Sequence, residues 1–387
     1  MRNERIAVLD VRSFEVSFLI GSKGINNTFT FTDKNVQYEG FAEDGFFDEE
    51  SFCLAVLEAV SSLRKTYDGK INQVYVGVPA FFIRLATKWH SITFSKKRKI
   101  TPNDVQTLFE NGMSELAASG KCIHRSAMYF SLGDATKYYR AEEMYATPAA
   151  SLSGGLSYYF VDETFERLVR ETLQKLGITN VEFLPQSLAQ ALYLLPAKER
   201  EGYAFLLDVG FLNSSVSVVY GDGIVHEESF PCGVASILVS LMEHLGVDYE
   251  TAEEILRSAN IAGGGVAPDL MWADENGASF PVAIINDVIK YGVDGLCEQV
   301  QEFFAKHYRG KENLIANKTL WMTGEGVESI AGIAEHISRR LNHLHKIARP
   351  DLPYHDRAGD SSKVALLAMA AAMPKKKGWK LFGGRKK

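Results

Sequence analysis

The sequence predicts an α/β fold of two lobes built on one plan. Two stretches, residues 5–21 and 203–223, each read as an apolar strand that ends in Asp-Val, a short polar turn and a returning apolar strand. Strands and amphipathic helices alternate in both halves of the chain, as they do in α/β lobes. One copy of the Asp-tipped hairpin opens each half, so we expect a duplicated fold that grips a ligand between the two turns.

Length and composition set broad limits. The 387 residues suffice for two domains of ordinary size, and 46% hydrophobic residues provide a core for each. The four cysteines lie far apart and form no Cys-x-x-Cys pair, which predicts reduced core residues of a cytosolic protein rather than disulfides or a metal site. We expect no signal peptide, and no apolar stretch approaches the roughly 20 residues that span a bilayer.

Charge is unevenly distributed. The formal net charge is −6, but residues 374–387 carry seven Lys and Arg and no acidic residue, so removing these seven charges leaves −13 for the remainder. An acidic body argues against nucleic-acid binding. The basic tail interleaves its cations with three apolar side chains, which predicts reversible docking on an anionic membrane surface; the alternative is a disordered basic end. The predicted membrane-binding residues are Lys375, Lys376, Lys377, Trp379, Lys380, Leu381, Phe382 and Arg385.

The first lobe is predicted from residues 1–80, 162–200 and 340–373. Its predicted helix at residues 48–64 opens at Asp48, whose carboxylate suits a helix N-cap, and buries apolar residues at helical spacing. Beyond the first hairpin, the other predicted elements are strands at 26–32, 73–78 and 181–185 and helices at 164–176, 187–195 and 361–373.

Residues 81–161 are predicted to form a small α+β insertion in the first lobe. Thr101 as N-cap and Pro102 at the first helical position predict a helix that ends near residue 113. Around it we predict strands at 83–94, 128–132, 138–144 and 155–161, with a loop of small residues at 148–155.

The second lobe is predicted from residues 201–235 and 284–339, with a smaller subdomain at 236–283. A late apolar strand, 319–323, runs into Gly324-Glu325-Gly326 and then into a helix from about residue 329. The other predicted helices are 236–245, 249–257 and 284–307, and residues 279–282 are expected in a short hairpin.

These features together resemble the actin/Hsp70/sugar-kinase ATPase fold. The resemblance rests on the two Asp-tipped hairpins, on Thr-Gly-Glu-Gly-Val-Glu-Ser-Ile-Ala-Gly at 323–332 and on the alanine-rich last helix. An insertion at this place is similar to that of the bacterial FtsA/PilM branch, since Ile-Thr-Pro-Asn-Asp-Val at 100–105 resembles the start of its helix and Pro148 to Gly154 its end. The basic tail resembles the membrane-targeting segment of FtsA, which PilM lacks.

The resemblance implies a nucleotide site between the lobes. Asp10 and Asp208 would hold Mg²⁺ through water. Each signal also has a simpler interpretation: turn-forming Asp residues, a plain strand-to-helix turn at Gly324 and Gly326, and a solvated helix pair for Glu253 and Arg257. The implied nucleotide-binding residues are Asp10, Ser13, Asp208, Gly210, Asn213, Ser214, Glu253, Arg257, Gly324 and Gly326.

The turns depart from the family pattern. Arg12 stands where FtsA relatives have glycine, Phe211 and Leu212 replace two glycines, and Ser215 replaces an aspartate. In the later Ala-Glu-x-Ile-Lys motif, Leu256 replaces the lysine. Phosphate cradles depend on bare backbone N–H groups at close approach. We therefore expect weak ATP/Mg binding or none, and no significant ATPase activity.

The function implied by the resemblance is that of an FtsA-like cell division protein. It would lie on the inner face of the cytoplasmic membrane at the division site, recruit the tubulin-like FtsZ through its second lobe and self-associate into filaments. The alternative is a PilM-like component of a pilus or secretion platform that binds a short peptide of a membrane partner. A third alternative, a sugar kinase or ATPase, is disfavoured by the altered phosphate turns.

Overall fold

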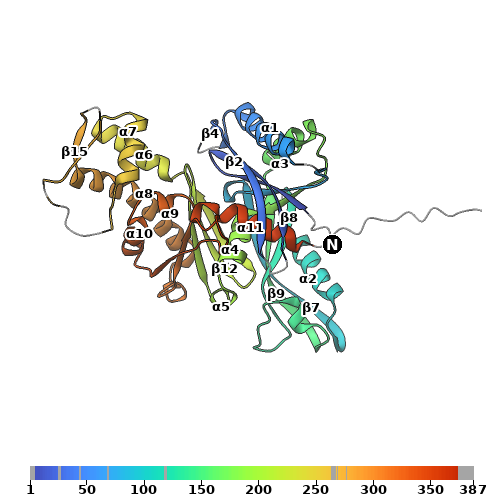
Figure 1. Ribbon diagram of the computed structural model, residues 1–387. Coiled ribbons are helices and arrows are strands. Elements are labelled where there is room, and N and C mark those ends of the chain that lie inside the picture. The colour runs from blue at the N-terminus through green and yellow to red at the C-terminus, as the bar shows by residue number, and fades with distance from the viewer. Residues whose placement is uncertain are drawn as a thin grey trace, which may run out of the picture.

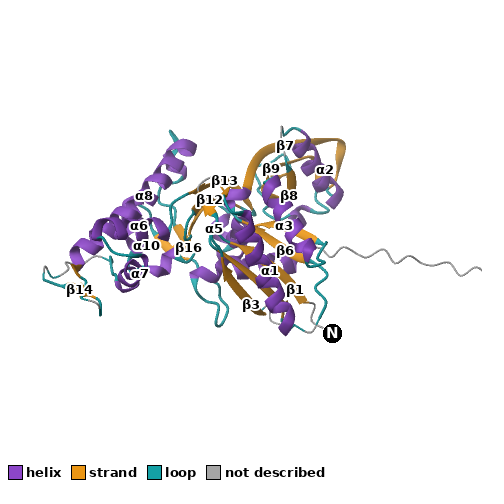
Figure 2. Cartoon of the chain, turned by 90° about the horizontal axis from the view of Figure 1, so that it is seen from above, coloured by secondary structure: helices purple, strands orange, loops and turns teal. Residues whose placement is uncertain are grey.

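The computed structural model describes residues 5–24, 28–42, 45–67, 69–116, 120–262, 267, 269–275 and 277–373. Two lobes, each built on a five-stranded sheet, lie side by side, and a third, three-stranded sheet projects beneath the first lobe (Figure 1). Helices flank both large sheets (Figure 2). The predicted two-lobed α/β class with an insertion in the first lobe is therefore confirmed.

The first lobe has a mixed sheet in the order β10-β6-β1-β2-β3. β1 (Arg5–Val11) and β2 (Glu15–Lys23) form the predicted antiparallel hairpin, and β1 pairs in parallel with β6. Helices α1 and α3 cover one face of this sheet, and α4 and α11 cover the other. The remaining elements are β3 (Phe29–Gln37), β4 (Phe41–Ala42), β5 (Gly45–Phe46), α1 (Glu49–Thr66), β6 (Val74–Val78), α3 (Glu163–Lys175), β10 (Val181–Pro185), α4 (Gln186–Leu194), α5 (Ala197–Arg200) and α11 (Ser361–Ala372).

Helix α11 lies close to the first sheet because glycine leaves room for it. A Cβ on Gly77 of β6 would collide with Leu366, and one on Gly21 of β2 would collide with Leu367. Both leucines are fully buried. The last helix thus ties the C-terminal part of the described chain to the lobe that the N-terminal hairpin begins.

The second lobe repeats the plan with the sheet order β13-β12-β11-β16-β17. Helices α6, α8 and α10 contribute to the core on one face, while Ala191 and Leu195, from the region of α4, pack on the other. β13 was missed by the sequence analysis, and β17 pairs with β16 although it falls in the range 340–373 that we assigned to the first lobe. The elements are β11 (Ala204–Val209), β12 (Ser214–Tyr220), β13 (Gly223–Phe230), α8 (Val282–Tyr308), β16 (Leu320–Thr323), α9 (Gly326–Ser329), α10 (Ile333–Leu341) and β17 (His345–Ile347).

A smaller subdomain stands above the second sheet. It contains the helices α6 (Val234–Leu245) and α7 (Tyr249–Ser258) and the short hairpin of β14 (Met271–Ala273) and β15 (Ser279–Pro281). Asp48 caps α1 and Asp248 caps α7 through their carboxylates, as expected for helix-starting aspartates. No helix within the described ranges is long and apolar enough to cross a membrane.

The structure of the insertion differs from two of the sequence predictions. Its sheet has the order β7-β9-β8, with α2 (Pro102–Ser114) packed against it and opened by the Thr101 capping box. The predicted loop at 148–155 is instead the first half of one long strand, which pairs with β7 from Pro148 onward and with β8 from Ser153 onward. The predicted strand at 138–144 is an isolated bridge at Tyr138 followed by a 3₁₀ turn. The strands are β7 (Ile83–Lys99), β8 (Lys121–Ser131) and β9 (Pro148–Val161).

Candidate functional site

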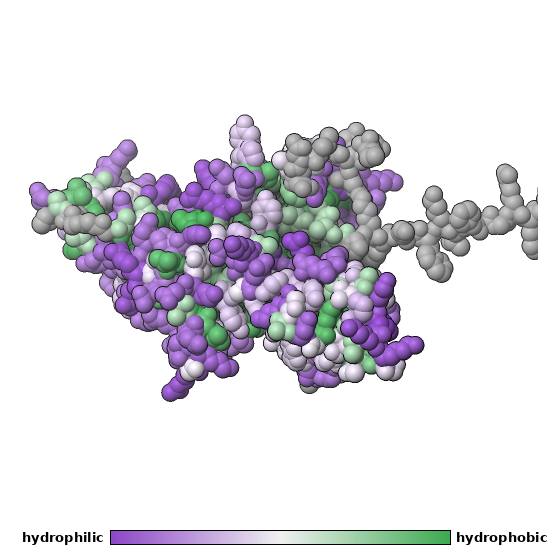
Figure 3. Space-filling view, turned by 90° about the horizontal axis from the view of Figure 1, so that it is seen from below, coloured by the Kyte–Doolittle hydropathy of each residue, from purple (hydrophilic) through white to green (hydrophobic). Residues whose placement is uncertain are grey.

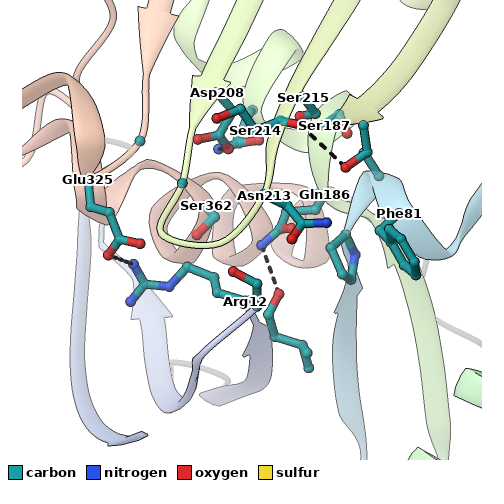
Figure 4. A pocket seen from close by; sticks show the side chains of 18 of the residues that line it. Arg12, Phe81, Gln186, Ser187, Asp208, Asn213, Ser214, Ser215, Glu325 and Ser362 are labelled. Carbon is teal, nitrogen blue, oxygen red and sulfur yellow. Dashed lines mark hydrogen bonds and ion pairs between the residues drawn. The ribbon is translucent and has the colours of Figure 1, made fainter. Parts of the chain in front are cut away.

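The two Asp-tipped turns meet in the cleft between the lobes. The rings of Phe14 and Phe211 lie 4.2 Å apart between centroids, and the backbone N–H of Leu212 donates to Ser13 Oγ at 3.2 Å. A pocket lies beside this contact and is lined from both turns (Figure 4). The turns therefore share one crevice, as the duplicated pattern predicted.

Helix α4 supplies both aspartates with amide donors. Gln186 donates to Asp10 Oδ1 at 2.5 Å, and Gln190 donates to Asp208 Oδ2 at 2.7 Å. The two glutamines are four residues apart, so they lie on the same face of the helix, one turn above the other. A single helix thus holds the carboxylates of both lobes in a fixed relation.

Both carboxylate oxygens of Asp10 accept hydrogen bonds. Asp10 is fully buried, and its second oxygen accepts a hydrogen bond of 2.6 Å from Ser362 at the start of α11. Burial raises the pKa of Asp10, while Arg12 and these hydrogen bonds act in the opposite direction. The carboxyl group is therefore a structural anchor of the first turn.

Asp208 lies against the turn that follows β16. Gly324 has φ +92°, and a Cβ there would overlap Asp208 Oδ1 and the carbonyl oxygen of Val209. Burial raises the pKa of Asp208, although the hydrogen bond from Gln190 and the charge of Arg12 lower it. Glycine is thus required at 324 by backbone conformation and by the close approach to the carboxylate.

Arg12 carries a positive charge into the middle of the cleft. Its Nη1 lies 3.3 Å from Glu325 Oε2 across the cleft, it also pairs with Glu15, and its Nε is 4.0 Å from Asp10 Oδ2 (Figure 4). Burial opposes this charge, but Glu325, Asp10 and Glu15 outweigh burial and raise the pKa of Arg12 above its ordinary value. A permanent cation therefore links the two lobes.

Glu325, the cross-cleft partner of Arg12, titrates near neutrality. Burial raises its pKa to about 7, even though the charge of Arg12 lowers it. Protonation of Glu325 would remove the negative charge that pairs with Arg12.

This arrangement is a poor fit for the Mg²⁺ ion suggested from Asp10 and Asp208. Both oxygens of Asp10 already accept hydrogen bonds, and a guanidinium group lies beside them. A divalent cation beside Asp10 would be repelled by the positive charge of Arg12, whose Nε lies 4.0 Å from Asp10 Oδ2. Within the described residues there is also no cluster of three or more His, Cys, Asp or Glu side chains that could hold a metal ion.

The pocket nevertheless retains unused polar atoms. Arg12 Nε, Asn213 Nδ2 and Ser214 Oγ are buried and have no hydrogen-bond partner among the described residues, and all three residues line the pocket. Buried donors usually have partners, including water. These atoms are suited to water or a small oxyanion, while Phe211 and Leu212 occupy the turn where a phosphate cradle needs bare backbone.

The remaining predicted residues lie around the pocket between the turns and around a larger cleft. Glu253 and Arg257, paired at 3.4 Å on α7, line a larger cleft of about 2240 Å³ that also reaches Glu325. Gly326 is buried, and a Cβ there would collide with Val209. The role of Glu253, Arg257 and Gly326 in nucleotide binding stays a prediction. The predicted residues that line the smaller pocket are Ser13, Asp208, Gly210, Asn213, Ser214 and Gly324.

Sequence reasoning missed four polar residues that hold the site together: Gln186, Gln190, Ser361 and Ser362. A usable signal was present for three of them, because Gln186 opens a helix directly after a buried strand and Ser361 and Ser362 open the last helix. The predicted membrane-binding residues, Lys375, Lys376, Lys377, Trp379, Lys380, Leu381, Phe382 and Arg385, lie outside the described residues.

Comparisons with known proteins bear on the fold. No family model matches the sequence, and no curated protein matches it. Among solved structures, a chain of the PilM–PilN type IV pilus biogenesis complex is similar, with a TM-score of 0.62, 12% identity, and 95% of this chain and 99% of that chain covered. MreB5 of Spiroplasma citri bound to ADP is similar with a TM-score of 0.53, 10% identity and coverage of 95% and 97%. EutJ of Carboxydothermus hydrogenoformans is similar with a TM-score of 0.51, 10% identity and coverage of 95% and 90%.

These similarities extend over nearly the whole chain, and they agree with the paired sheets and the facing turns described above. The protein therefore has the actin-like ATPase fold.

Proposed function

We propose that the protein is an actin-fold adaptor that works without hydrolysing ATP. The observation that carries this proposal is the position of Arg12. Near the two aspartates, its guanidinium group pairs with a carboxylate of each lobe, Asp10 and Glu325. The contact between Phe14 and Phe211 joins the turns directly. The lobes would then be held together by contacts of the protein itself, without a nucleotide between them.

The adaptor role is that of an FtsA-like division protein. Its basic tail, residues 374–387, would bind the inner face of the cytoplasmic membrane, since each Lys or Arg near an anionic surface contributes about 1 kcal/mol. The second lobe would bind an FtsZ-like tubulin homologue at the division site, and copies of the protein would associate into filaments. The acidic remainder of the chain favours protein partners over nucleic acid.

A PilM-like role is the second candidate. The observation that favours it is the similarity to a chain of the PilM–PilN complex, with a TM-score of 0.62 against 0.53 for MreB5. In this role the protein would bind a short peptide of a membrane partner in a pilus or secretion platform. The basic tail distinguishes the two candidates, because only the FtsA-like role requires it to bind lipid.

Nucleotide independence is tested by isothermal titration with Mg-ATP and by a phosphate-release assay. We expect no binding in the micromolar range and no release of phosphate above background. Micromolar affinity or steady turnover would contradict the proposal.

The two candidate roles are separated by flotation with anionic vesicles and by peptide capture. The full chain should float and a chain ending at residue 373 should not. The full chain should also retain a C-terminal peptide of FtsZ in preference to an N-terminal peptide of a PilN-like protein. Equal flotation of both chains together with the opposite peptide preference would favour the PilM-like role.

A further inference from the structure

A second groove lies away from the cleft, where the insertion meets the second lobe. Its volume is about 1070 Å³. The molecular surface is indented between these two parts when seen from the side of the insertion (Figure 3). The insertion and the second lobe both contribute walls, so the groove exists only in the assembled fold. Its lining residues are Thr87, Lys88, Trp89, Met128, Tyr129, Lys137, Gly155, Gly202, Tyr203, Tyr220, Asn313, Leu314 and Lys318.

Aromatic rings form a continuous surface across this groove. Trp89 is 52% exposed, which is unusual for so large an apolar side chain, and its ring lies 5.5 Å from that of Tyr129. Tyr129 in turn lies 5.4 Å from Tyr220, and Tyr220 lies 5.3 Å from Tyr203 on the second lobe. Tryptophan and tyrosine are enriched at the centres of protein interfaces, where they bury a large area at a low cost in conformational entropy.

The groove is cationic although the chain as a whole is acidic. Three of its lining residues are lysines, and none is Asp or Glu. Lys88 pairs with Glu115 at 2.8 Å outside the groove. Lys137 donates to the Tyr220 hydroxyl at 2.5 Å and lies 4.7 Å from the Tyr129 ring, and in the described part of the chain neither Lys137 nor Lys318 has an ion-pair partner. Two positive charges are therefore left for an external ligand.

We propose that this groove binds an acidic peptide segment that carries an aromatic or large aliphatic side chain. The apolar side chain would pack on Trp89 and Tyr129, and carboxylates beside it would pair with Lys137 and Lys318. A basic segment would meet the two lysines with no compensating carboxylate in the groove. Nucleic acid shares the preference for aromatic and cationic groups, but the net charge of −6 repels a long polyanion.

The proposal adds a partner site to the adaptor function and does not depend on lipid or nucleotide. Its probe is a pool of fluorescein-labelled twelve-residue peptides with Asp or Glu at four positions and Phe, Leu, Ile or Trp at four others. A matched pool has Lys or Arg at the same four positions. Fluorescence anisotropy with the full chain should show binding of the acidic pool, weakened by added salt, and at least about tenfold weaker binding of the basic pool.

Substitutions of groove residues test whether the acidic peptides bind in this groove. The double variant Lys137→Gln/Lys318→Gln and the single variant Trp89→Ala should each bind the acidic pool at least about tenfold more weakly. Lys137→Arg/Lys318→Arg keeps the charge and should keep the binding, which separates recognition from a loss of structure. Lys175→Gln, an exposed charge at the end of α3, is the matched control and should change nothing.

Several results would overturn the proposal. They are a failure of the acidic pool to bind at millimolar concentration, equal binding of the two pools, and unchanged binding by the glutamine double variant. Tighter binding of a single-stranded oligonucleotide that depends on the same lysines would assign the groove to nucleic acid instead. None of these results affects the nucleotide or vesicle experiments, so failure here leaves the adaptor proposal standing.

Discussion

The two hairpin turns have the same strand pairing and differ in the side chains that they place in the cleft. In each, the aspartate stands opposite a serine of the returning strand, Asp10 opposite Ser17 and Asp208 opposite Ser215. The first turn then projects the charged Arg12, whereas the second presents the apolar Phe211. The difference shows that a duplicated backbone can be kept while one turn becomes a donor of charge and the other a packing surface.

The comparison also shows how the two lobes contact each other at the cleft. A glycine-rich turn leaves space that a phosphate fills, and the lobes then meet through the ligand. Here Arg12, Phe211 and Leu212 stand in place of such glycines, Phe211 contacts Phe14 of the other turn, and Arg12 pairs with Glu325. These contacts between the lobes are made by side chains of the protein itself.

The largest expected effect comes from removing the central cation. Arg12→Met leaves the fully buried Asp10 and the partly exposed Glu15 and Glu325 without their partner. The loss of unfolding free energy should lie between the roughly 1 kcal/mol of an exposed pair and the roughly 3–5 kcal/mol of a buried one. The measurement is urea unfolding at pH 8. The control is Arg257→Met, which removes an exposed pair with Glu253 and should cost less than about 1 kcal/mol. Equal losses for both variants would mean that the buried cation contributes no special stability.

The second prediction concerns a variant that restores glycine at the three turn positions where this sequence departs from the family pattern. The variant Arg12→Gly/Phe211→Gly/Leu212→Gly exposes bare backbone at both turns and should raise Mg-ATP affinity at least about tenfold in isothermal titration. The matched control carries alanine at the same three positions, which shortens the side chains but keeps each Cβ. If the alanine variant gains as much affinity, side-chain bulk rather than backbone approach limits binding.

The third prediction concerns pH. The pKa of Glu325 is raised from about 4.5 to about 7 in the folded protein, so the folded state binds more protons than the unfolded state between these values and its stability falls as pH rises through this range. The unfolding free energy of the wild type relative to Glu325→Gln should therefore decrease from pH 5 to pH 8. A difference that is constant with pH, or that increases, would show that Glu325 does not titrate as its burial indicates.

The smallest effect is the coupling between the two rings. A double-mutant cycle of Phe14→Ala and Phe211→Ala should give a coupling energy of about 0.5–1.5 kcal/mol, as measured for aromatic pairs in contact. Urea unfolding of the four proteins provides it. A coupling indistinguishable from zero would indicate that the contact between the two rings does not help to hold the lobes together.

Local signals account for most of the correct sequence predictions. Asp48, Thr101 and Pro102 mark helix starts because capping depends on a few adjacent residues. The errors fall where a distant partner decides the state. Residues 148–155 are small enough for a loop, and they form a strand because β7 pairs with them, joined by β8 on the other side from Ser153 onward.

The sequence by itself determined the two lobes, the positions of both aspartates and the loss of the glycines, since each depends on residues close together in the chain. Only the tertiary structure decided that Gln186, Gln190 and Ser362 hold those aspartates and that Arg12 reaches Glu325. Arg12 and Glu325 are 313 positions apart. No periodicity or spacing along a chain specifies such a contact, because it arises from the packing of two sheets around a shared helix.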